Sequence, residues 1–277
     1  MGTQKTSGKI VHRAAVLGSP IEHSRSPVLH NAGYAASGLD EWEYDRFECT
    51  EDQLAQLVSS ADSSYRGFSV TMPAKFAALN FADEVTDRAR AIGSANTLVR
   101  TDHGWRADNT DVDGIKGALG ELLEGASLSG KHAVVIGSGG TARPAIWALI
   151  EAGVAHITVL NRSDRTAELK TLFDDTSTTL SYAPIKDAQV EADVIISTVP
   201  SSAIEGMEAQ LAQAPVLDVI YDPWPTPLVQ QAQKAGHGAV GGHVMLAHQS
   251  FGQFEQFTGK PAPQAHMREA LEQSLGF

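Results

Sequence analysis

Apolar residues recur with two different periods along this chain of 277 residues. Runs that are apolar throughout or alternate with polar residues predict β-strands, whereas apolar residues spaced three and four apart predict amphipathic helices. In the first half, strands are expected at 12–18, 42–49, 65–71, 97–100 and 105–107, and helices at 26–37, 51–59, 83–92 and 111–123. Ser26 and Pro27 suit an N-cap serine followed by proline at the first position of the helix.

The second half repeats a strand followed by a helix. Strands are expected at 155–161, 193–198 and 216–221 and a helix at 164–173, and two amphipathic helices close the chain at 243–257 and 263–275. This alternation predicts an α/β protein with a parallel sheet that is covered by helices on both faces. The length of the chain fits two domains of ordinary size.

A glycine-rich turn near the middle of the chain is the first candidate binding site. An apolar strand leads into Gly137, Gly139 and Gly140, and a helix begins directly afterwards. Glycines let the backbone approach a pyrophosphate, and a helix N-terminus offers unpaired N–H groups with a partial positive charge. Ala142 stands where the common Gly-x-Gly-x-x-Gly pattern has its third glycine, which is an accepted variant. By itself the turn fits a nucleotide site and a tight strand-to-helix connection equally well.

The residues after the next strand indicate which dinucleotide to expect. Asn161 follows Gly137 at close to the roughly 20 residues at which NAD enzymes place an acid on the adenosine ribose. This chain has Arg162 in that region, a bidentate donor suited to a 2′-phosphate, with Asn161 and Ser163 as further partners. We therefore predict NADP(H) rather than NAD(H). The alternative is an exposed basic helix start whose charge Asp164 partly neutralises.

Composition narrows the classes of function. Thirty-three acidic against 21 basic residues give a net charge of −12, which disfavours nucleic acid and anionic membrane surfaces as partners. No apolar run approaches the roughly 20 residues of a membrane span, and the polar start of the chain does not resemble a signal peptide. The single cysteine, Cys49, suits a reducing compartment. We expect a cytoplasmic protein.

The ten histidines do not predict a metal site. None has the His-Glu-x-x-His spacing, and His243 and His248, five residues apart, do not share a helix face.

Polar residues in the first half are candidates for substrate contacts. Ser24 and Ser26 lie where a strand gives way to a helix, a position at which hydroxyls and helix N–H groups can hold a carboxylate. Lys75 lies just past the end of an apolar strand, and Asn96 and Asp111 lie at the ends of elements. Taken singly, these residues fit an ordinary helix cap, a solvated lysine and turns.

Taken together, these segments resemble the shikimate dehydrogenase family. The motifs that carry the resemblance are Ser-Arg-Ser-Pro at 24–27, Val-Thr-Met-Pro-x-Lys at 70–75, Ser-Ala-Asn-Thr-Leu at 94–98, Asp-Asn-Thr-Asp at 108–111, the glycine turn, Asn-Arg-Ser at 161–163, Asp-Val-Ile-Tyr-Asp-Pro at 218–223 and Gly-His-Val-Met-Leu-x-x-Gln at 242–249. They cover nearly the whole chain in the order and spacing of the family.

The resemblance implies two α/β domains with a deep cleft between them. Residues 1–110 would form the substrate domain, completed by the C-terminal helices at 243–277, and 111–242 a Rossmann-like, doubly wound NADP domain. The activity implied is reversible NADPH-dependent reduction of 3-dehydroshikimate to shikimate in aromatic amino-acid (chorismate) biosynthesis, by a monomer or homodimer.

It also implies roles for individual residues. Lys75 and Asp111 would be the catalytic pair. The substrate would meet Ser24 and Ser26 through its carboxylate, and Thr71, Lys75, Asn96, Asp111 and Gln249 through its hydroxyls, with Tyr221 close by. NADP(H) would contact Gly137, Ser138, Gly139, Gly140, Thr141, Ala142, Asn161, Arg162, Ser163, Arg165, Thr198, Val199, Pro200, Ile220, Gly242 and Met245. One departure from the family is Thr166, which stands where a second phosphate-binding arginine is common; Arg165 lies one residue earlier.

Three alternatives bear on this interpretation. An NAD-dependent quinate/shikimate dehydrogenase would have an acid after the second cofactor strand and threonine in place of Ser26. A methylenetetrahydrofolate dehydrogenase fits the Ser-Arg-Ser and Asp-Asn-Thr-Asp motifs poorly. A non-catalytic NADPH-binding sensor would not need both Lys75 and Asp111.

Overall fold

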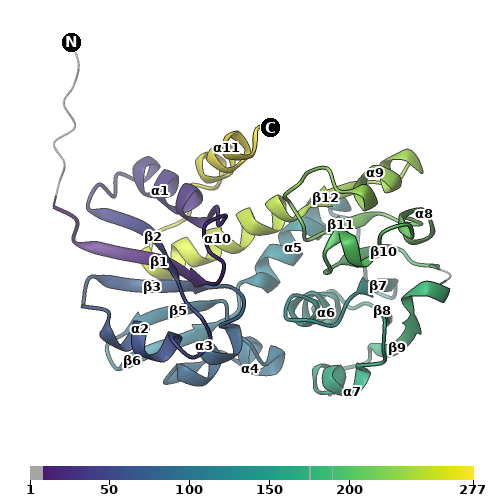
Figure 1. The fold of residues 1–277 in the computed structure, drawn as a ribbon, viewed down its shortest axis with the longest axis horizontal. Helices are drawn as coiled ribbons and strands as arrows, with labels where there is room; N and C mark the ends of the chain where they lie inside the picture. The colour runs from purple at the N-terminus through teal and green to yellow at the C-terminus, as the bar shows by residue number, and fades with distance from the viewer. Residues whose placement is uncertain (1–8, 175, 189) are drawn as a thin grey trace, which may run out of the picture. The chain divides into compact units, whose positions relative to one another are not determined.

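The computed structural model describes residues 9–174, 176–188 and 190–277. The chain divides into two compact units. The first combines the residues up to Thr110 with Ser250–Phe277, and the second is the continuous stretch Asp111–Gln249. Within the described residues each unit is built on one six-stranded sheet (Figure 1).

The sheet of the first unit mixes parallel and antiparallel strands. Its order is β2 (Trp42–Glu48), β1 (His12–Gly18), β3 (Tyr65–Val70), β5 (Thr97–Thr101), β6 (Gly104–Asp108) and β4 (Glu84–Val85). Strand β1 is parallel to both of its neighbours, whereas β5 is antiparallel to β3 and β6. A hairpin joins β5 to β6, and Thr101 pairs with Gly104 at its turn.

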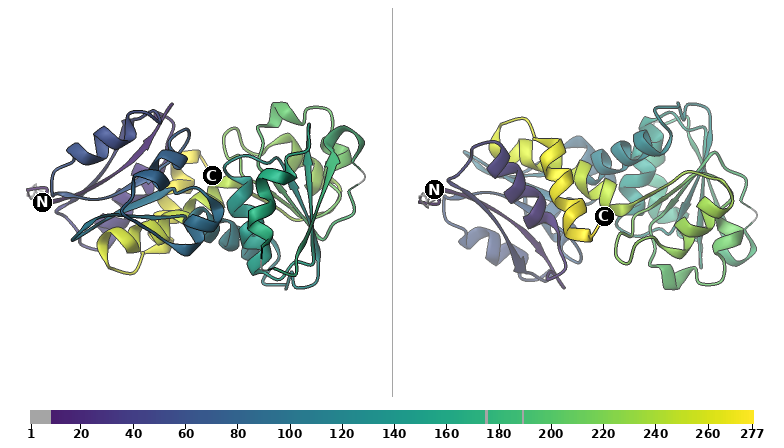
Figure 2. Two further views of the ribbon diagram at one scale, coloured as in Figure 1. Left: turned by 90° about the horizontal axis from the view of Figure 1, so that it is seen from below. Right: turned by 90° about the horizontal axis from the view of Figure 1, so that it is seen from above.

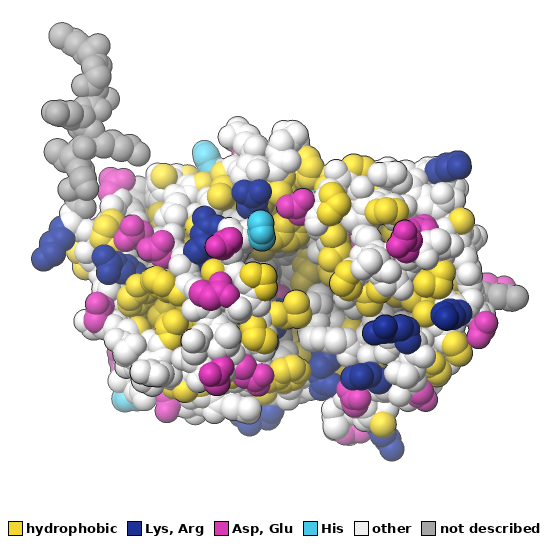
Figure 3. Space-filling view, in the orientation of Figure 1, with side chains coloured by type: hydrophobic (Ala, Val, Ile, Leu, Met, Phe, Trp, Pro, Cys, Tyr) yellow, Lys and Arg dark blue, Asp and Glu magenta, His cyan; other side chains and the backbone are white. Residues whose placement is uncertain are grey.

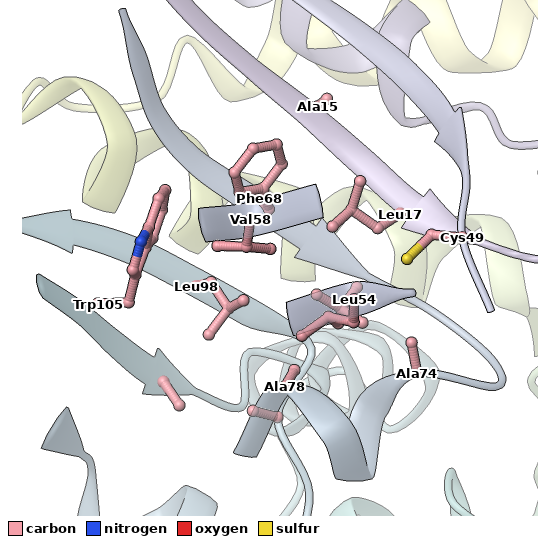
Figure 4. Close-up of a cluster of buried hydrophobic side chains, with 13 residues drawn as sticks. Ala15, Leu17, Cys49, Leu54, Val58, Phe68, Ala74, Ala78, Leu98 and Trp105 are labelled. Atoms are coloured by element: carbon pink, nitrogen blue, oxygen red, sulfur yellow. The ribbon is translucent and has the colours of Figure 1, made fainter. Parts of the chain in front are cut away.

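Helices cover both faces of this sheet, and the alternation of side chains along β3 shows how. Phe68 points into a core with α2 (Leu54–Ser60) and α3 (Lys75–Phe81) (Figure 4). Its neighbour Gly67 faces the other side, where a Cβ would lie 2.1 Å from the ring of Phe257 in α10 (Gly242–Thr258). On that side α1 (Ser26–Ala36) packs against α11 (Gln264–Leu275), as Figure 2 shows. The short α4 (Asp87–Ile92) contacts β6.

The second unit is a doubly wound parallel sheet. Its order is β12 (Ala239–Gly241), β11 (Val216–Asp218), β10 (Val194–Ser197), β7 (His132–Ile136), β8 (His156–Asn161) and β9 (Thr179–Pro184). Numbered from β7, this is the strand order 3-2-1-4-5-6 of dinucleotide-binding folds, with the order reversing between β7 and β10. Ligands bind such sheets at the carboxyl ends of the strands beside that reversal.

Helices lie on both sides of this sheet (Figure 2). One side carries α5 (Asp111–Leu122) and α6 (Ala142–Glu151), which pack against each other. The other carries α8 (Glu208–Leu211) and α9 (Pro227–Lys234), whose Leu211 and Leu228 share a buried cluster with Ile195 and Val216. Helix α7 (Thr166–Leu169) continues as a 3-10 helix, Lys170–Phe173, and further 3-10 turns are Ile185–Asp187 and Ser201–Ala203.

Two expected helices differ from the structure. The helix expected at 83–92 is wrong in its first turn: Glu84–Val85 forms an edge strand beside β6, and Thr86 then caps α4 by accepting a hydrogen bond from Ala89 N–H. The helix expected at 164–173 is α-helical for only four residues. Strands β9 and β12 and helices α3, α8 and α9 were not predicted. Strand β12 and helix α8 have three and four residues, too few to show a period, whereas the amphipathic pattern of α9 was overlooked.

Asp108, at the end of β6, makes a pH-dependent contribution to the first unit. Burial by itself raises the pKa of this carboxyl, but hydrogen bonds from Arg88, Thr86 and Gln256, with the positive charge of Arg88, outweigh burial and lower the pKa to about 2. The folded state therefore binds fewer protons than the unfolded state between the unfolded pKa of about 3.9 and pH 2.

We expect this contribution, about 2–3 kcal/mol, to be complete above about pH 5 and to be lost as the pH falls toward 2. Urea denaturation of the wild type and of Asp108→Asn at pH 7 and pH 3.5 tests this. The wild type should lose more stability between the two pH values than the variant does; equal losses would contradict the assignment.

Candidate active site

The two serines of the first unit lie at the start of α1. Helix α1 begins at Ser26 itself, so the expectation that Ser26 is the N-cap is wrong. Arg25 holds the N-cap position without a capping side chain, and Ser24 Oγ accepts a 3.4 Å hydrogen bond from Ser26 N–H. Ser26 is buried and bonds the hydroxyl of Tyr44, whereas Ser24 is half-buried. The structure thus brings two hydroxyls together at a helix N-terminus.

Thr71 and Lys75 follow the carboxyl end of β3. Thr71 N–H donates to Leu17 O of β1 at 2.8 Å, and Lys75 is the first residue of α3. Gly18 lets Thr71 come this close to the end of β1, because a Cβ on Gly18 would lie 2.3 Å from Thr71 Cγ2. The carbonyl of Lys75 also accepts from Ala95 N–H at 3.0 Å, so α3 is tied to the segment that carries Asn96.

Asn96 is buried with a fixed amide orientation. Its Oδ1 accepts from the backbone N–H of Thr110 at 2.7 Å and from the hydroxyl of Thr97 at 2.8 Å. A backbone N–H can only donate, so the atom facing Thr110 must be the oxygen. Gln253 of α10, which sequence reasoning missed, donates to the backbone oxygen of Asn96 at 3.2 Å.

Asp111 and Gln249 belong to the second unit. Asp111 is the first residue of α5, where a carboxylate is favoured by the helix dipole. One turn on, a Cβ on Gly114 would lie 2.7 Å from Met245 O and 3.2 Å from Gln249 Cβ, so α5 and α10 are in close contact. The start of α5 therefore lies beside the part of α10 that carries Gln249. The predicted catalytic partner of Asp111, Lys75, belongs to the first unit.

The glycine turn is built to leave its outer side open. Gly137 has a φ of +103°, and a Cβ there would lie 2.6 Å from Thr198 Oγ1 and 2.7 Å from Val199 Cγ1. Over Gly139 and Gly140, in contrast, nothing lies within 4 Å. Helix α6 starts next to this space, and its N-cap, Thr141, makes no side-chain capping bond. Open space at an uncapped helix N-terminus fits a pyrophosphate.

A basic loop, residues 161–165, is held against the glycine turn. Asn161 Nδ2 donates to Ser138 Oγ at 2.8 Å, and Asn161 Oδ1 accepts from Arg162 N–H at 2.9 Å. The carboxylate of Asp164 accepts from both the N–H and the hydroxyl of Thr166, which lowers its pKa. This acid is thus engaged in starting α7. Lysine and arginine side chains gather over the region of β8 and α7 (Figure 3).

A further cation near this loop was not predicted. Arg143, in the first turn of α6, donates to Glu168 O in α7 at 2.7 Å, so its guanidinium extends toward the helix that follows the basic loop. A cation in the first turn of a helix opposes the helix dipole. This unfavourable placement of Arg143 is the feature of the sequence that could have indicated a role for it at the cofactor site. Arg165 forms a 3.6 Å ion pair with Glu168.

The remaining predicted cofactor residues lie at the end of β11 and the start of α10. Gly242 N–H donates to Ile220 O at 3.1 Å, and a Cβ on Gly242 would lie 1.9 Å from Val219 O. Met245 is buried in the first turn of α10, and Tyr221, after β11, is half-buried. Pro200 follows Val199 and is exposed.

Searches for metal and membrane sites gave no candidates in the described residues. No three His, Cys, Asp or Glu side chains there converge in a way that could hold a metal ion. No helix in the same residues is long and apolar enough to cross a membrane.

Comparison with known proteins places these features in one family. Residues 16–98 match the shikimate dehydrogenase substrate binding domain, 120–216 match shikimate / quinate 5-dehydrogenase, and 242–272 match the shikimate 5′-dehydrogenase C-terminal domain. The chain is 35% identical over 271 residues to shikimate dehydrogenase (NADP(+)) of Caulobacter vibrioides, covering 94% of this chain and 95% of that protein.

Solved structures agree. Shikimate dehydrogenase of Mycobacterium tuberculosis is 49% identical and superimposes with a TM-score of 0.88, covering 95% of this chain and 99% of that one. A shikimate 5-dehydrogenase of Mycobacterium fortuitum is 51% identical with a TM-score of 0.85, covering 94% and 97%. With full-length relatives at this identity, and with the fold and motifs described above, the chain belongs to the shikimate dehydrogenase family.

Proposed function

We propose that this protein catalyses the reversible NADPH-dependent reduction of 3-dehydroshikimate to shikimate, a step of aromatic amino-acid biosynthesis. The observation that carries the proposal is the full-length match to a curated NADP(+)-dependent shikimate dehydrogenase. We further propose a cytoplasmic monomer or homodimer that acts on small molecules alone.

The second unit has the groups that NADP(H) requires. The open backbone at Gly139 and Gly140 and the start of α6 would hold the pyrophosphate. Arg162 would bind the 2′-phosphate, aided by Asn161 and Ser163. When bound, NADP(H) supplies or accepts the hydride. The Asn161–Ser138 hydrogen bond supports this assignment, because it ties the basic loop to the glycine turn.

The predicted substrate residues come from both units. The Ser24 and Ser26 hydroxyls at the start of α1 suit the carboxylate, and Asn96 and Thr71 suit ring oxygens. As negative charge develops on the carbonyl oxygen during reduction, the Lys75 ammonium would stabilise it and give it a proton. Asp111 would accept a hydrogen bond from the neighbouring hydroxyl and so orient the ring. In the reverse direction Lys75 would take the proton from the hydroxyl being oxidised.

The activity itself is tested by a matrix of two cofactors against two substrates. We expect turnover with NADP⁺ and shikimate to exceed turnover with NAD⁺ or with quinate. Arg162 favours the 2′-phosphate of NADP⁺, and Ser26 stands where quinate-using relatives have threonine. Steady-state kinetics of the purified protein measure all four combinations. No turnover in any of them, with NADPH binding intact, would indicate a binding protein rather than an enzyme.

Replacing Lys75 tests the catalytic assignment. Lys75→Ala should lower kcat about 10²- to 10⁴-fold with a much smaller change in KM, as expected for loss of a general acid. Lys131→Ala is the control, since Lys131 forms an exposed 3.2 Å ion pair with Asp193. An effect confined to KM would show that Lys75 only binds substrate.

Replacing Arg162 tests cofactor choice. Arg162→Ala should weaken NADPH binding by about 1.5–3 kcal/mol while leaving NADH binding unchanged, because only NADPH carries the 2′-phosphate. Fluorescence titration of both cofactors measures this, with Arg13→Ala, which removes an exposed ion pair to Glu43, as control. Equal weakening of NADH binding would refute the 2′-phosphate role.

A further inference from the structure

A buried chain of hydrogen bonds runs from β2 to Asn96 through Gln253. The Tyr44 hydroxyl donates to Ser69 Oγ at 2.6 Å, and Ser69 donates to Gln253 Oε1 at 2.8 Å. Gln253 Nε2 donates to Asn96 O at 3.2 Å and to Thr97 Oγ1 at 3.1 Å. Every member of this chain is at most 4% exposed. All of them belong to the first unit.

The direction of this chain is set by groups that have only one hydrogen-bonding role. The backbone oxygen of Asn96 can only accept, so the atom of Gln253 that faces it is the amide nitrogen, and the oxygen faces Ser69. Because Thr97 Oγ1 accepts from Gln253, its own proton is available to Asn96 Oδ1, which lies 2.8 Å away.

The consequence falls on the Asn96 side chain. Its Oδ1 already accepts from Thr97 and from Thr110 N–H, and the Thr110 hydroxyl lies 3.2 Å away as a third donor. An amide oxygen has two lone pairs, so this one is saturated. Asn96 can therefore serve a ligand only as a donor through its Nδ2, toward a lone pair on a substrate oxygen.

We propose that Gln253 is a positioning residue for the substrate: through Thr97, and alongside the Thr110 N–H, it holds the Asn96 amide in place as a hydrogen-bond donor to a substrate oxygen. The inference rests on the proposed function, in which Asn96 contacts the substrate. Gln253 itself is 2% exposed, and it lies more than 150 residues from Asn96 in the chain. Helix α10 thus helps to set the hydrogen-bonding role of a residue in the first half of the chain.

The test compares two substitutions on the same helix. Gln253→Leu removes both donors and the acceptor at similar volume. Gln256→Leu is the matched control, since Gln256 lies one turn further on and its amide donates to Asp108 Oδ2 at 2.8 Å instead of to Thr97. Thr97→Val is a second test variant, because it removes only the relay hydroxyl and keeps Gln253 in place.

We expect Gln253→Leu and Thr97→Val to raise KM for shikimate about 5- to 30-fold, the loss of one to two hydrogen bonds, with a smaller fall in kcat. NADP⁺ binding, measured by fluorescence titration, should stay within about two-fold of wild type. Gln256→Leu should leave KM unchanged, although it lowers the melting temperature. Calorimetric titration of shikimate into each protein saturated with NADP⁺ gives the same comparison without turnover.

Three outcomes would overturn the proposal. One is a KM for shikimate within two-fold of wild type in a folded Gln253→Leu or Thr97→Val protein. Another is an equal rise in KM in the Gln256→Leu control, which would indicate a general effect of loosening α10. The third is an equal loss of NADP⁺ binding. If wild-type protein shows neither turnover nor shikimate binding, the proposed function fails instead, and this result is distinct from all three.

Discussion

The polar segment Asp108–Thr110 is fully buried at one end of the first sheet, and much of the first unit is organised to satisfy its hydrogen bonds. Asp108 takes bonds from Arg88, Thr86 and Gln256, Asn109 Nδ2 donates to Ser94 O, and Thr110 N–H donates to Asn96. A buried polar group without a partner costs more than its bond would return, so these partners are required together. The Thr110 N–H holds Asn96 Oδ1 as an acceptor, and the next residue, Asp111, begins α5. The side chain of Asn96, a predicted substrate contact, is therefore held in part by the same hydrogen bonds that satisfy this buried segment.

Sequence patterns found the elements whose apolar period is strong. Strand β1 and helices α1, α5, α10 and α11 are close to their expected positions, and the glycine turn lies between strand and helix as expected. Edge strands such as Glu84–Val85 are too short to show a period, and there the Thr86 cap decided the structure. The candidate residues followed from motifs, yet nothing in spacing could relate Gln253 to Asn96. That relation depends on tertiary packing of a helix from the far end of the chain. The sequence pattern also could not show that Ser26 lies inside helix α1 rather than at its N-cap.

The glycines show the same limit of prediction from sequence. Gly18, Gly67 and Gly242 are required because a side chain would collide with Thr71, Phe257 and the Val219 backbone. Gly139 and Gly140 meet nothing within 4 Å, so their lack of a side chain leaves room for a ligand instead. In the sequence all five are the same letter. Only the structure separates glycines that bring protein segments together from glycines that keep a space open, and this second group marks the candidate cofactor site.

The division of the chain has a consequence for how the protein is made. The second unit is one continuous stretch, so it can fold as soon as it has left the ribosome. The first unit cannot, because Phe257 of α10 covers its sheet at Gly67, and Phe254 of α10 packs against Tyr34 of α1. The residues before Thr110 therefore complete their unit only after the whole second unit has been made. Until α10 has been synthesised, the apolar face that it covers stays open to solvent, so during translation this unit is the half that exposes an aggregation-prone surface.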